Sequence, residues 1–135
     1  MGCFRDDHLT DRIIYCVILV HQTLGPGFLE AVYRRALVIE LNKHNLATEV
    51  EKEILIYYDG QKVGRHRLDL LIEGRVIVEL KAVEALSKAD YAQVRSYLKA
   101  AQLNLALLVN FSPERADFRR IETSHPPISI SPLCP

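Results

Sequence analysis

The fold of this chain is decided by residues 67–82, which read RLDLLIEGRVIVELKA. Two aliphatic runs flank Glu73-Gly74, and a short polar break containing glycine between such runs is typical of a β-hairpin. Each run also carries charge where a central strand normally buries apolar groups, with Asp69 in the first and Glu79 and Lys81 in the second. We therefore expect a hairpin that holds two acids and a base within a sheet.

The register of this hairpin determines whether the three charged side chains meet. Side chains alternate between the faces of a strand, so Glu79 and Lys81 share one face. A two-residue loop at Glu73-Gly74 places Asp69 on the other face, whereas a three-residue loop over 72–74, with Gly74 left-handed, brings Asp69 onto theirs. The sequence leaves both loops open. It also leaves open a purely structural salt bridge between Lys81 and either acid.

Periodicity outside the hairpin predicts the remaining elements. Apolar residues at helical spacing predict three helices, the last opened by a capping box from Ser87 to Asp90; they cover 10–24, from just after 27 to about 45, and 88–101. Alternating or continuous apolar runs predict strands at 48–50, 53–58, 62–72, 75–82 and 105–110. The element order is α-α-β-β-β-α-β, an antiparallel meander followed by a crossover to a buried strand, with a helix or turn near 115–121.

Length and composition fit a single folded domain. The chain has 135 residues, 49% of them hydrophobic and 25% charged, which excludes a disordered or low-complexity protein. We expect a domain over 10–123, an N-terminal tail over 1–9 and a proline-rich tail over 124–135. Seventeen acids balance seventeen bases, so no net charge attracts polyanions or membranes, and no apolar run is long enough to span a bilayer. We expect a cytoplasmic protein.

Two carboxylates and an ammonium on one sheet face suit metal-assisted hydrolysis. Mg²⁺ binds oxygen ligands and usually keeps several waters, so Asp69, Glu79 and the Leu80 carbonyl would suffice as protein ligands. Lys81 would orient or help to deprotonate the attacking water and offset charge developing on phosphorus. The substrate that fits this chemistry best is a phosphodiester.

One residue of the second expected helix breaks its apolar pattern. At 100° per residue, Glu30 lies within about 60° of Tyr33, Leu37 and Leu41, on a largely apolar stripe. A carboxylate in the first turn of a helix is also favoured by the helix dipole. The helix alone does not distinguish a functional Glu30 from a capping one.

These residues together resemble the PD-(D/E)xK nuclease superfamily. The resemblance rests on Asp69, nine intervening residues, then Glu79-Leu80-Lys81, preceded by a helix with Glu30 and followed by a helix with Gln93. More narrowly, GFLEAVY at 27–33 is similar to the signature of the small bacterial GxxExxY proteins. The resemblance covers roughly residues 20–121. Leu68 stands where the superfamily often has proline.

The resemblance implies a fold and a role for each matched residue. The fold would be α/β (α+β), a restriction-endonuclease-like core with a mixed four-stranded sheet flanked by helices. Asp69 and Glu79 would bind metal, Lys81 would be the catalytic lysine, Glu30 an additional acid, and Gln93 would line the site. The cofactor would be Mg²⁺ or Mn²⁺.

The expected function is therefore metal-dependent cleavage of nucleic acid, with DNA ahead of RNA as substrate. Phosphate contacts are expected from Arg34, Arg67 and Lys88. A different class of function remains open, a non-catalytic protein-interaction module that keeps the nuclease fold. The neutral net charge and the nearly all-round apolar helix 10–24, which could form a homodimer, favour that alternative. A phosphohydrolase acting on a small substrate at the same metal site is a third hypothesis.

Overall fold

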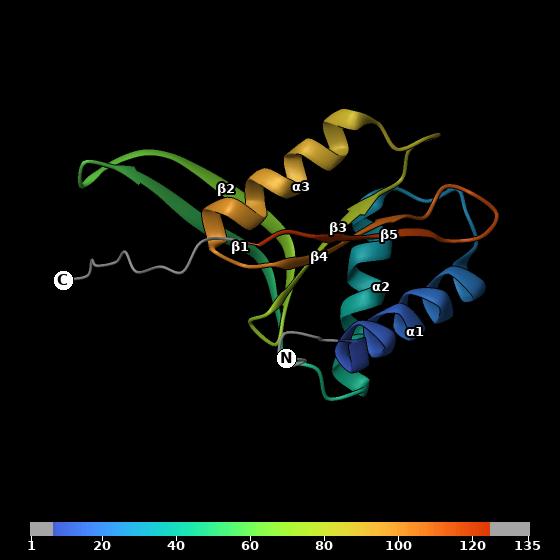
Figure 1. The fold of residues 1–135 in the computed structure, drawn as a ribbon. Coiled ribbons are helices and arrows are strands. Elements are labelled where there is room, and N and C mark those ends of the chain that lie inside the picture. Colours follow the sequence, from blue (N-terminus) through green and yellow to red (C-terminus); the bar gives the residue numbers. More distant parts are fainter. Residues whose placement is uncertain (1–6, 125–135) are drawn as a thin grey trace.

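The computed structural model describes residues 7–124, which form three helices and five strands (Figure 1). The helices are α1 (Asp7–Leu24), α2 (Glu30–Lys43) and α3 (Lys88–Ala101), and the strands are β1 (Thr48–Tyr58), β2 (Gln61–Ile72), β3 (Val76–Lys81), β4 (Leu105–Asn110) and β5 (Asp117–Glu122). The helix over 88–101 and the strand over 105–110 have the predicted bounds.

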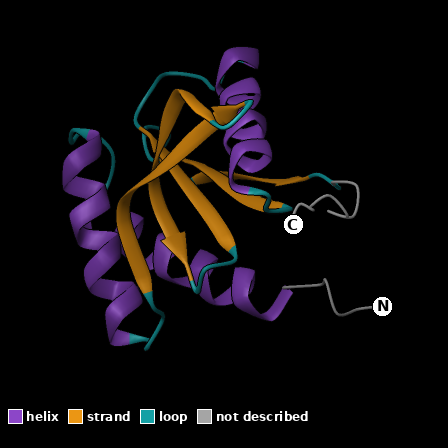
Figure 2. Cartoon of the chain, turned by 90° about the vertical axis from the view of Figure 1, so that its left-hand side faces the viewer, coloured by secondary structure: helices purple, strands orange, loops and turns teal. Residues whose placement is uncertain are grey.

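The five strands form one mixed sheet in the order β1-β2-β3-β4-β5. Neighbouring strands are antiparallel except for β3 and β4, which are parallel and joined by the crossover through α3. The helices pack on both sides of this sheet (Figures 1 and 2). The expected restriction-endonuclease-like class, a mixed sheet flanked by helices, is confirmed, although the sheet has five strands instead of four.

The fifth strand replaces the helix or turn expected near 115–121. Phe118 and Ile121 are three residues apart, which imitates helical spacing in so short a segment. In the structure this segment runs antiparallel to β4 and pairs Ile121 with Ala106. The free edge of β4 offers backbone groups that need partners, so pairing with them outweighs local preference.

The bounds of other elements also differ from the prediction. The first helix begins at Asp7, so the tail expected over 1–9 is partly helical, with Leu9 only 6% exposed. The second helix begins at Glu30, after an irregular turn, and β1 joins into one strand the two segments expected at 48–50 and 53–58. The C-terminal tail expected over 124–135 lies outside the described residues, apart from Ser124.

Two apolar cores fill the space on either side of the sheet. One core packs α1 and α2 against the sheet face that carries Leu70, and the other packs α3 against the face that carries Leu68. Residues two apart in a regular strand share a face, so β2 must change face at Asp69. Opposite this point, Glu51 of β1 has a left-handed backbone with φ 52°. The distortion places Asp69 at the boundary between the two cores.

The apolar helix α1 faces inward. Ile13, Cys16 and Val17 are fully buried, and among the described residues of α1 Tyr15 is the one large hydrophobic side chain classed as exposed, at 55%. Its apolar composition is thus largely explained by packing on α2 and the sheet, and a homodimer through 10–24 stays a prediction. None of the described helices is long and apolar enough to cross a membrane.

Candidate functional site

The hairpin of β2 and β3 brings Asp69 and Glu79 together. Ile72 pairs with Val76, so the loop has three residues, as in the second alternative, but covers 73–75 instead of 72–74. Gly74 has the expected left-handed backbone, with φ 66°. Relative to the expected loop, the pairing is shifted by two residues, which again brings Asp69 next to Glu79, at the point where β2 changes face.

The two acids stand where β2 and β3 separate. The ladder between these strands ends at the pair Leu70 and Val78. One position further, the Asp69 N–H donates to Glu79 Oε1 at 3.3 Å and the Leu80 N–H donates to Asp69 Oδ2 at 2.9 Å. Carboxylate oxygens therefore replace carbonyls as acceptors at this fork.

Burial and like charge act together on Glu79. The residue is 6% exposed. Desolvation, followed by the nearby Asp69 carboxylate, raises the pKa of Glu79 to about 8, against the smaller opposing effects of the Asp69 N–H and of Lys81. Burial and the charge of Asp69 therefore disfavour the ionised form of Glu79 unless a further positive charge lies beside it.

Glu30 reaches the same neighbourhood from the first turn of α2. Desolvation raises its pKa, and the Asp69 carboxylate raises it further, while Lys81 and Arg34 act in the opposite direction. Glu30 is therefore near enough to interact electrostatically with Asp69 and Lys81, although it comes from a different layer. Tyr33, Leu37 and Leu41 are fully buried, as the apolar stripe predicts.

A tyrosine holds the loop that precedes Glu30. The Tyr33 hydroxyl donates to the Gly25 carbonyl at 2.6 Å and accepts from the Phe28 N–H at 3.1 Å. The Tyr33 ring stacks on Phe111, at the end of β4, with ring centroids 4.4 Å apart. The glycine-containing turn and the helix start are thereby fixed relative to the sheet.

The Lys81 ammonium contacts two side chains of α3. Its Nζ lies 3.2 Å from Gln93 Oε1 and 3.6 Å from Asp90 Oδ1. Among the described residues, the ion-pair partner of Lys81 within 4 Å is Asp90. Lys81 forms no such ion pair with Asp69 or Glu79, so the structural salt bridge that the sequence left open is not present. The side chain of Lys81 is 19% exposed.

Sequence reasoning missed the second role of Asp90. The predicted capping box is present, with Ser87 N–H donating to Asp90 and Asp90 N–H donating to Ser87. These hydrogen bonds lower the pKa of Asp90, and Lys81 lowers it further. Only the packing of α3 over β3 brings the capping carboxylate to the lysine.

Asn110 at the end of β4 was also missed. It is 1% exposed, and its amide makes two hydrogen bonds to the backbone of Val83, at 2.8 and 3.0 Å. Val83 follows Lys81 closely in the chain, so Asn110 fixes the path by which the chain leaves β3. A polar residue at the end of an apolar strand was the available signal.

The three predicted phosphate contacts differ in position. Arg34 lies beside the fork, 3.8 Å from Asp69 Oδ1 and 3.5 Å from Glu51 Oε2, with 18% of its side chain exposed. Arg67 and Lys88 are exposed, and no side-chain hydrogen bond or ion pair joins either to another described residue. The structure brings Arg34 together with the acids and leaves the other two side chains in solvent.

The oxygen donors at the fork match the preference of a hard divalent cation. Within residues 7–124, no three His, Cys, Asp or Glu side chains are grouped closely enough to hold a metal ion by themselves. Mg²⁺ needs only one or two carboxylates beside its waters. The N–H and C=O of one strand residue point to the same side, so the Leu80 carbonyl lies on the side where its N–H meets Asp69. The oxygen donors, and a pair of carboxyl groups that needs an added positive charge to ionise together, therefore fit such an ion.

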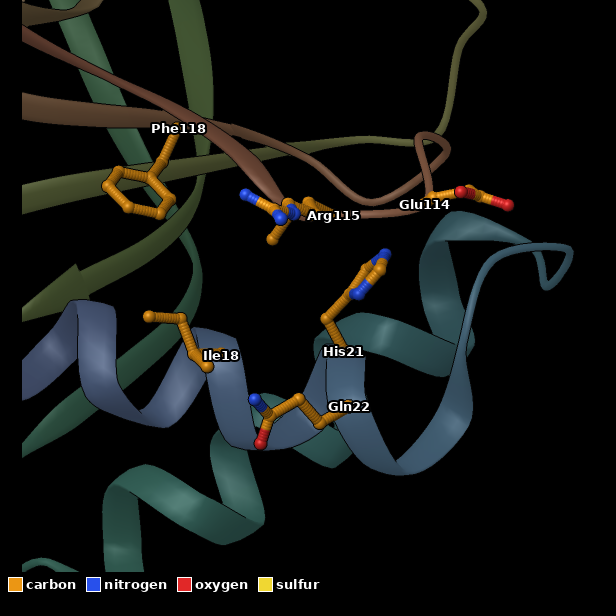
Figure 3. A pocket seen from close by; sticks show the side chains of 7 residues that line it. Ile18, His21, Gln22, Glu114, Arg115 and Phe118 are labelled. Atoms are coloured by element: carbon orange, nitrogen blue, oxygen red, sulfur yellow. The ribbon is translucent and has the colours of Figure 1, made fainter.

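A separate cavity of about 410 Å³ lies between α1 and the loop that precedes β5 (Figure 3). It is lined by Ile18, His21, Gln22, Glu114, Arg115, Ala116 and Phe118. None of the predicted site residues lines it. His21 is 5% exposed and its Nε2 is hydrogen-bonded to the Pro113 carbonyl at 2.8 Å, which explains the histidine as a structural residue.

A family model and one solved structure agree with this fold. The family model described as the PD-(D/E)XK nuclease superfamily matches residues 7–121. The crystal structure of SSO0001 is 20% identical, with a TM-score of 0.56, and the match covers 77% of this chain and 55% of that one. An alkaline exonuclease from Laribacter hongkongensis is 14% identical, with a TM-score of 0.43, over 84% of this chain and 70% of that one. This chain thus spans about half of SSO0001, and no curated protein matches it.

Proposed function

This chain belongs to the PD-(D/E)XK nuclease superfamily, and we propose that it is a Mg²⁺- or Mn²⁺-dependent nuclease that hydrolyses phosphodiester bonds of nucleic acid, DNA ahead of RNA. Members of this superfamily typically use a divalent metal. The proposal depends on one observation above others. At the fork of β2 and β3, two carboxyl groups accept backbone hydrogen bonds from each other's strands, and they lie so close together that ionising both is unfavourable without an added positive charge.

The metal would be held by Asp69, Glu79 and the Leu80 carbonyl. When bound, the ion supplies a lowered pKa for the attacking water and a positive charge for the phosphate. A buried, negatively charged pair is unfavourable unless a cation offsets it, which is the physical reason to expect binding here. The raised pKa of Glu79 supports this assignment.

The remaining residues would orient and exchange protons with the water and the substrate. Gln93 and Asp90 hold the Lys81 ammonium at the fork, where it can orient the attacking water or stabilise charge on the phosphate. Glu30, whose pKa is raised, could accept or hold a proton beside Asp69. Arg34, Arg67 and Lys88 are proposed phosphate contacts.

We also propose that the chain is a GxxExxY protein within this superfamily. The two hydrogen bonds of the Tyr33 hydroxyl support a physical reading of that signature, since they join the turn before Glu30 to α2. In this interpretation, Gly27 permits the turn because its backbone adopts φ 115°. Tyr33 then fixes the turn, and Glu30 extends into the proposed site.

Two measurements test the proposed function. Isothermal calorimetry with Mg²⁺ and Mn²⁺ should show binding by the wild type and its loss in the Asp69→Ala/Glu79→Ala protein; equal binding by both proteins would refute the ligand assignment. Labelled single-stranded DNA, duplex DNA, RNA and nucleotides should then be assayed with Mn²⁺. Cleavage that survives Lys81→Ala would point to contamination or another mechanism.

A further inference from the structure

A groove of about 400 Å³ lies between α2 and the edge strand β1, next to the candidate site. It is lined by Arg34, Arg35, Val38, Ile39, Val50 and Glu51. Arg34 connects the groove to the fork, because its guanidinium also lies 3.8 Å from Asp69. None of the proposed metal ligands lines the groove, so the groove would bind a ligand group other than the metal ion.

The groove exposes aliphatic surface. Ile39 is 60% exposed and Val50 is 46% exposed, while Val38, next to Ile39 on α2, is half-buried. Covering such surface is favourable by about 25 cal/mol per Å². Apolar residues of a helix and a strand thus line the same groove and offer a surface on which a flat or apolar ligand group could rest.

The groove is also cationic. Arg35 is exposed, and no ion pair joins it to another described residue. Arg34 shares its charge between Glu51 and Asp69 at 3.5 and 3.8 Å, so it is held in place beside this aliphatic surface. Guanidinium groups bind phosphate oxygens through two parallel hydrogen bonds, and two adjacent arginines favour an anionic ligand.

One wall of the groove has an unusual backbone. Glu51 has φ 52° within β1, between the pairs Val50–Leu70 and Lys52–Leu68. The left-handed region is unfavourable for a residue with a side chain, by about 1–2 kcal/mol, and such residues concentrate at functional sites. Here the distortion holds the carboxylate against Arg34 and shapes the end of the groove nearest the fork.

We propose that this groove binds one unpaired nucleotide next to the scissile phosphate of a nucleic-acid strand. Its phosphate would contact Arg35 and Arg34, and its sugar and base would cover Ile39 and Val50. A volume of about 400 Å³ is that of a small-ligand site, of the size of one nucleotide and too small for a pair of complete nucleotides. The inference rests on the proposed function and specifies a single-stranded segment as the part of the substrate bound here.

The test measures binding without cleavage. Fluorescence anisotropy measures the affinity of the protein for a labelled single-stranded DNA of about 12 nucleotides, in EDTA to prevent cleavage. We expect Ile39→Glu and Arg35→Ala each to weaken binding at least about fivefold, and Arg35→Ala to lower the slope of log Kd against log salt by about 0.7. Circular dichroism checks that each variant is folded, and Ile39→Ser replaces Ile39→Glu if the latter is not.

Two surface variants serve as matched controls. Val63 on β2 is 62% exposed, close to the value of Ile39, and lies outside the groove; Arg95 is exposed on α3. Val63→Glu and Arg95→Ala should each change the affinity by less than about twofold. If the controls weaken binding as much as the groove variants, if the groove variants bind like the wild type, or if the wild type does not bind the strand, the inference is overturned.

Cleavage in Mn²⁺ is scored separately, so the two hypotheses can fail independently. A wild type that binds the strand through the groove but neither binds metal nor cleaves would refute the proposed nuclease and retain the groove. A wild type that cleaves in a Lys81-dependent way, with groove variants that bind normally, would retain the nuclease and refute the groove.

Discussion

The two edges of β3 are built in opposite ways. Toward β4 it forms six successive parallel pairs, from Val76–Leu105 to Lys81–Asn110, and every residue of β4 is buried. Toward β2 it forms three antiparallel pairs, after which the strands separate and the Asp69 and Glu79 side chains accept the next hydrogen bonds. One strand thus joins an apolar ladder to a charged fork.

The difference shows how a small domain can keep charge in its interior. The β3–β4 ladder is continuous, so its backbone groups are satisfied without side chains and apolar residues can fill both faces. At the fork, backbone groups without ladder partners bind the carboxylates, which lowers the cost of burying them. A substitution in the ladder should therefore lower the stability of the protein, whereas a substitution at the fork should lower its catalytic rate.

The largest expected effect on stability comes from the ladder. Leu107 is fully buried and pairs with Val78. Leu107→Ala should lower the free energy of unfolding by about 3 kcal/mol, because it removes buried methyl groups and leaves a cavity. Urea denaturation measures the change. Leu55→Ala, at a position 39% exposed, should cost less than about 0.5 kcal/mol; equal losses would contradict the contrast.

At the fork, a comparable effect should appear in the rate instead of the stability. Lys81→Ala should lower the cleavage rate about a hundredfold or more, because it removes the ammonium beside the two acids. Single-turnover assays with Mn²⁺ give the rate. The exposed Lys99 of α3 offers the matched control, and a similar loss in Lys99→Ala would show that the effect is not specific to the fork.

A pH dependence of stability should distinguish the fork from the ladder. The pKa of Glu79 is raised from 4.5 to about 8 in the folded protein, so between these values the folded state holds a proton that the unfolded state releases. We therefore expect Glu79 to contribute most to the stability of the metal-free protein below pH 4.5. This stabilising contribution is lost as the pH rises toward 8.

Replacing the carboxyl group should remove this slope. In metal-free buffer, Glu79→Gln should raise the thermal midpoint at pH 8 by about 4 °C and leave it nearly unchanged near pH 5. Glu84→Gln, at an exposed position, provides the control. If the thermal midpoint of the wild type rose between pH 5 and pH 8 relative to that of Glu79→Gln, burial would not determine the pKa of this side chain.

The smallest effect concerns the loop that carries Glu30 to the fork. Tyr33→Phe keeps the ring that stacks on Phe111 and removes the hydroxyl that bonds Gly25 and Phe28. We expect a loss of about 1 kcal/mol in the free energy of unfolding and a lower cleavage rate. In a double-mutant cycle with Glu30→Gln, the rate effects should be less than additive; additive effects would mean that the tyrosine does not act through Glu30.

Regular elements with strong local signals could be predicted from the sequence. The capping box of Ser87 and Asp90 marks the start of α3, and the apolar run at 105–109 identifies a strand buried on both faces. In contrast, β5 has only Phe118 and Ile121 as apolar markers, and its strand conformation depends on the free edge of β4. A segment with a weak apolar pattern at the edge of a sheet becomes a strand because it pairs with the neighbouring strand.

For the candidate site, the sequence by itself determined which charges stand within apolar strands, and hence that Asp69, Glu79 and Lys81 required an explanation. The tertiary structure alone decided their partners. Lys81 meets Asp90 because α3 crosses over β3, and Arg34 reaches Asp69 because α2 packs beside the fork. The alternation along a strand is local and can be read from the residues, whereas the distance between two side chains depends on how separate layers pack.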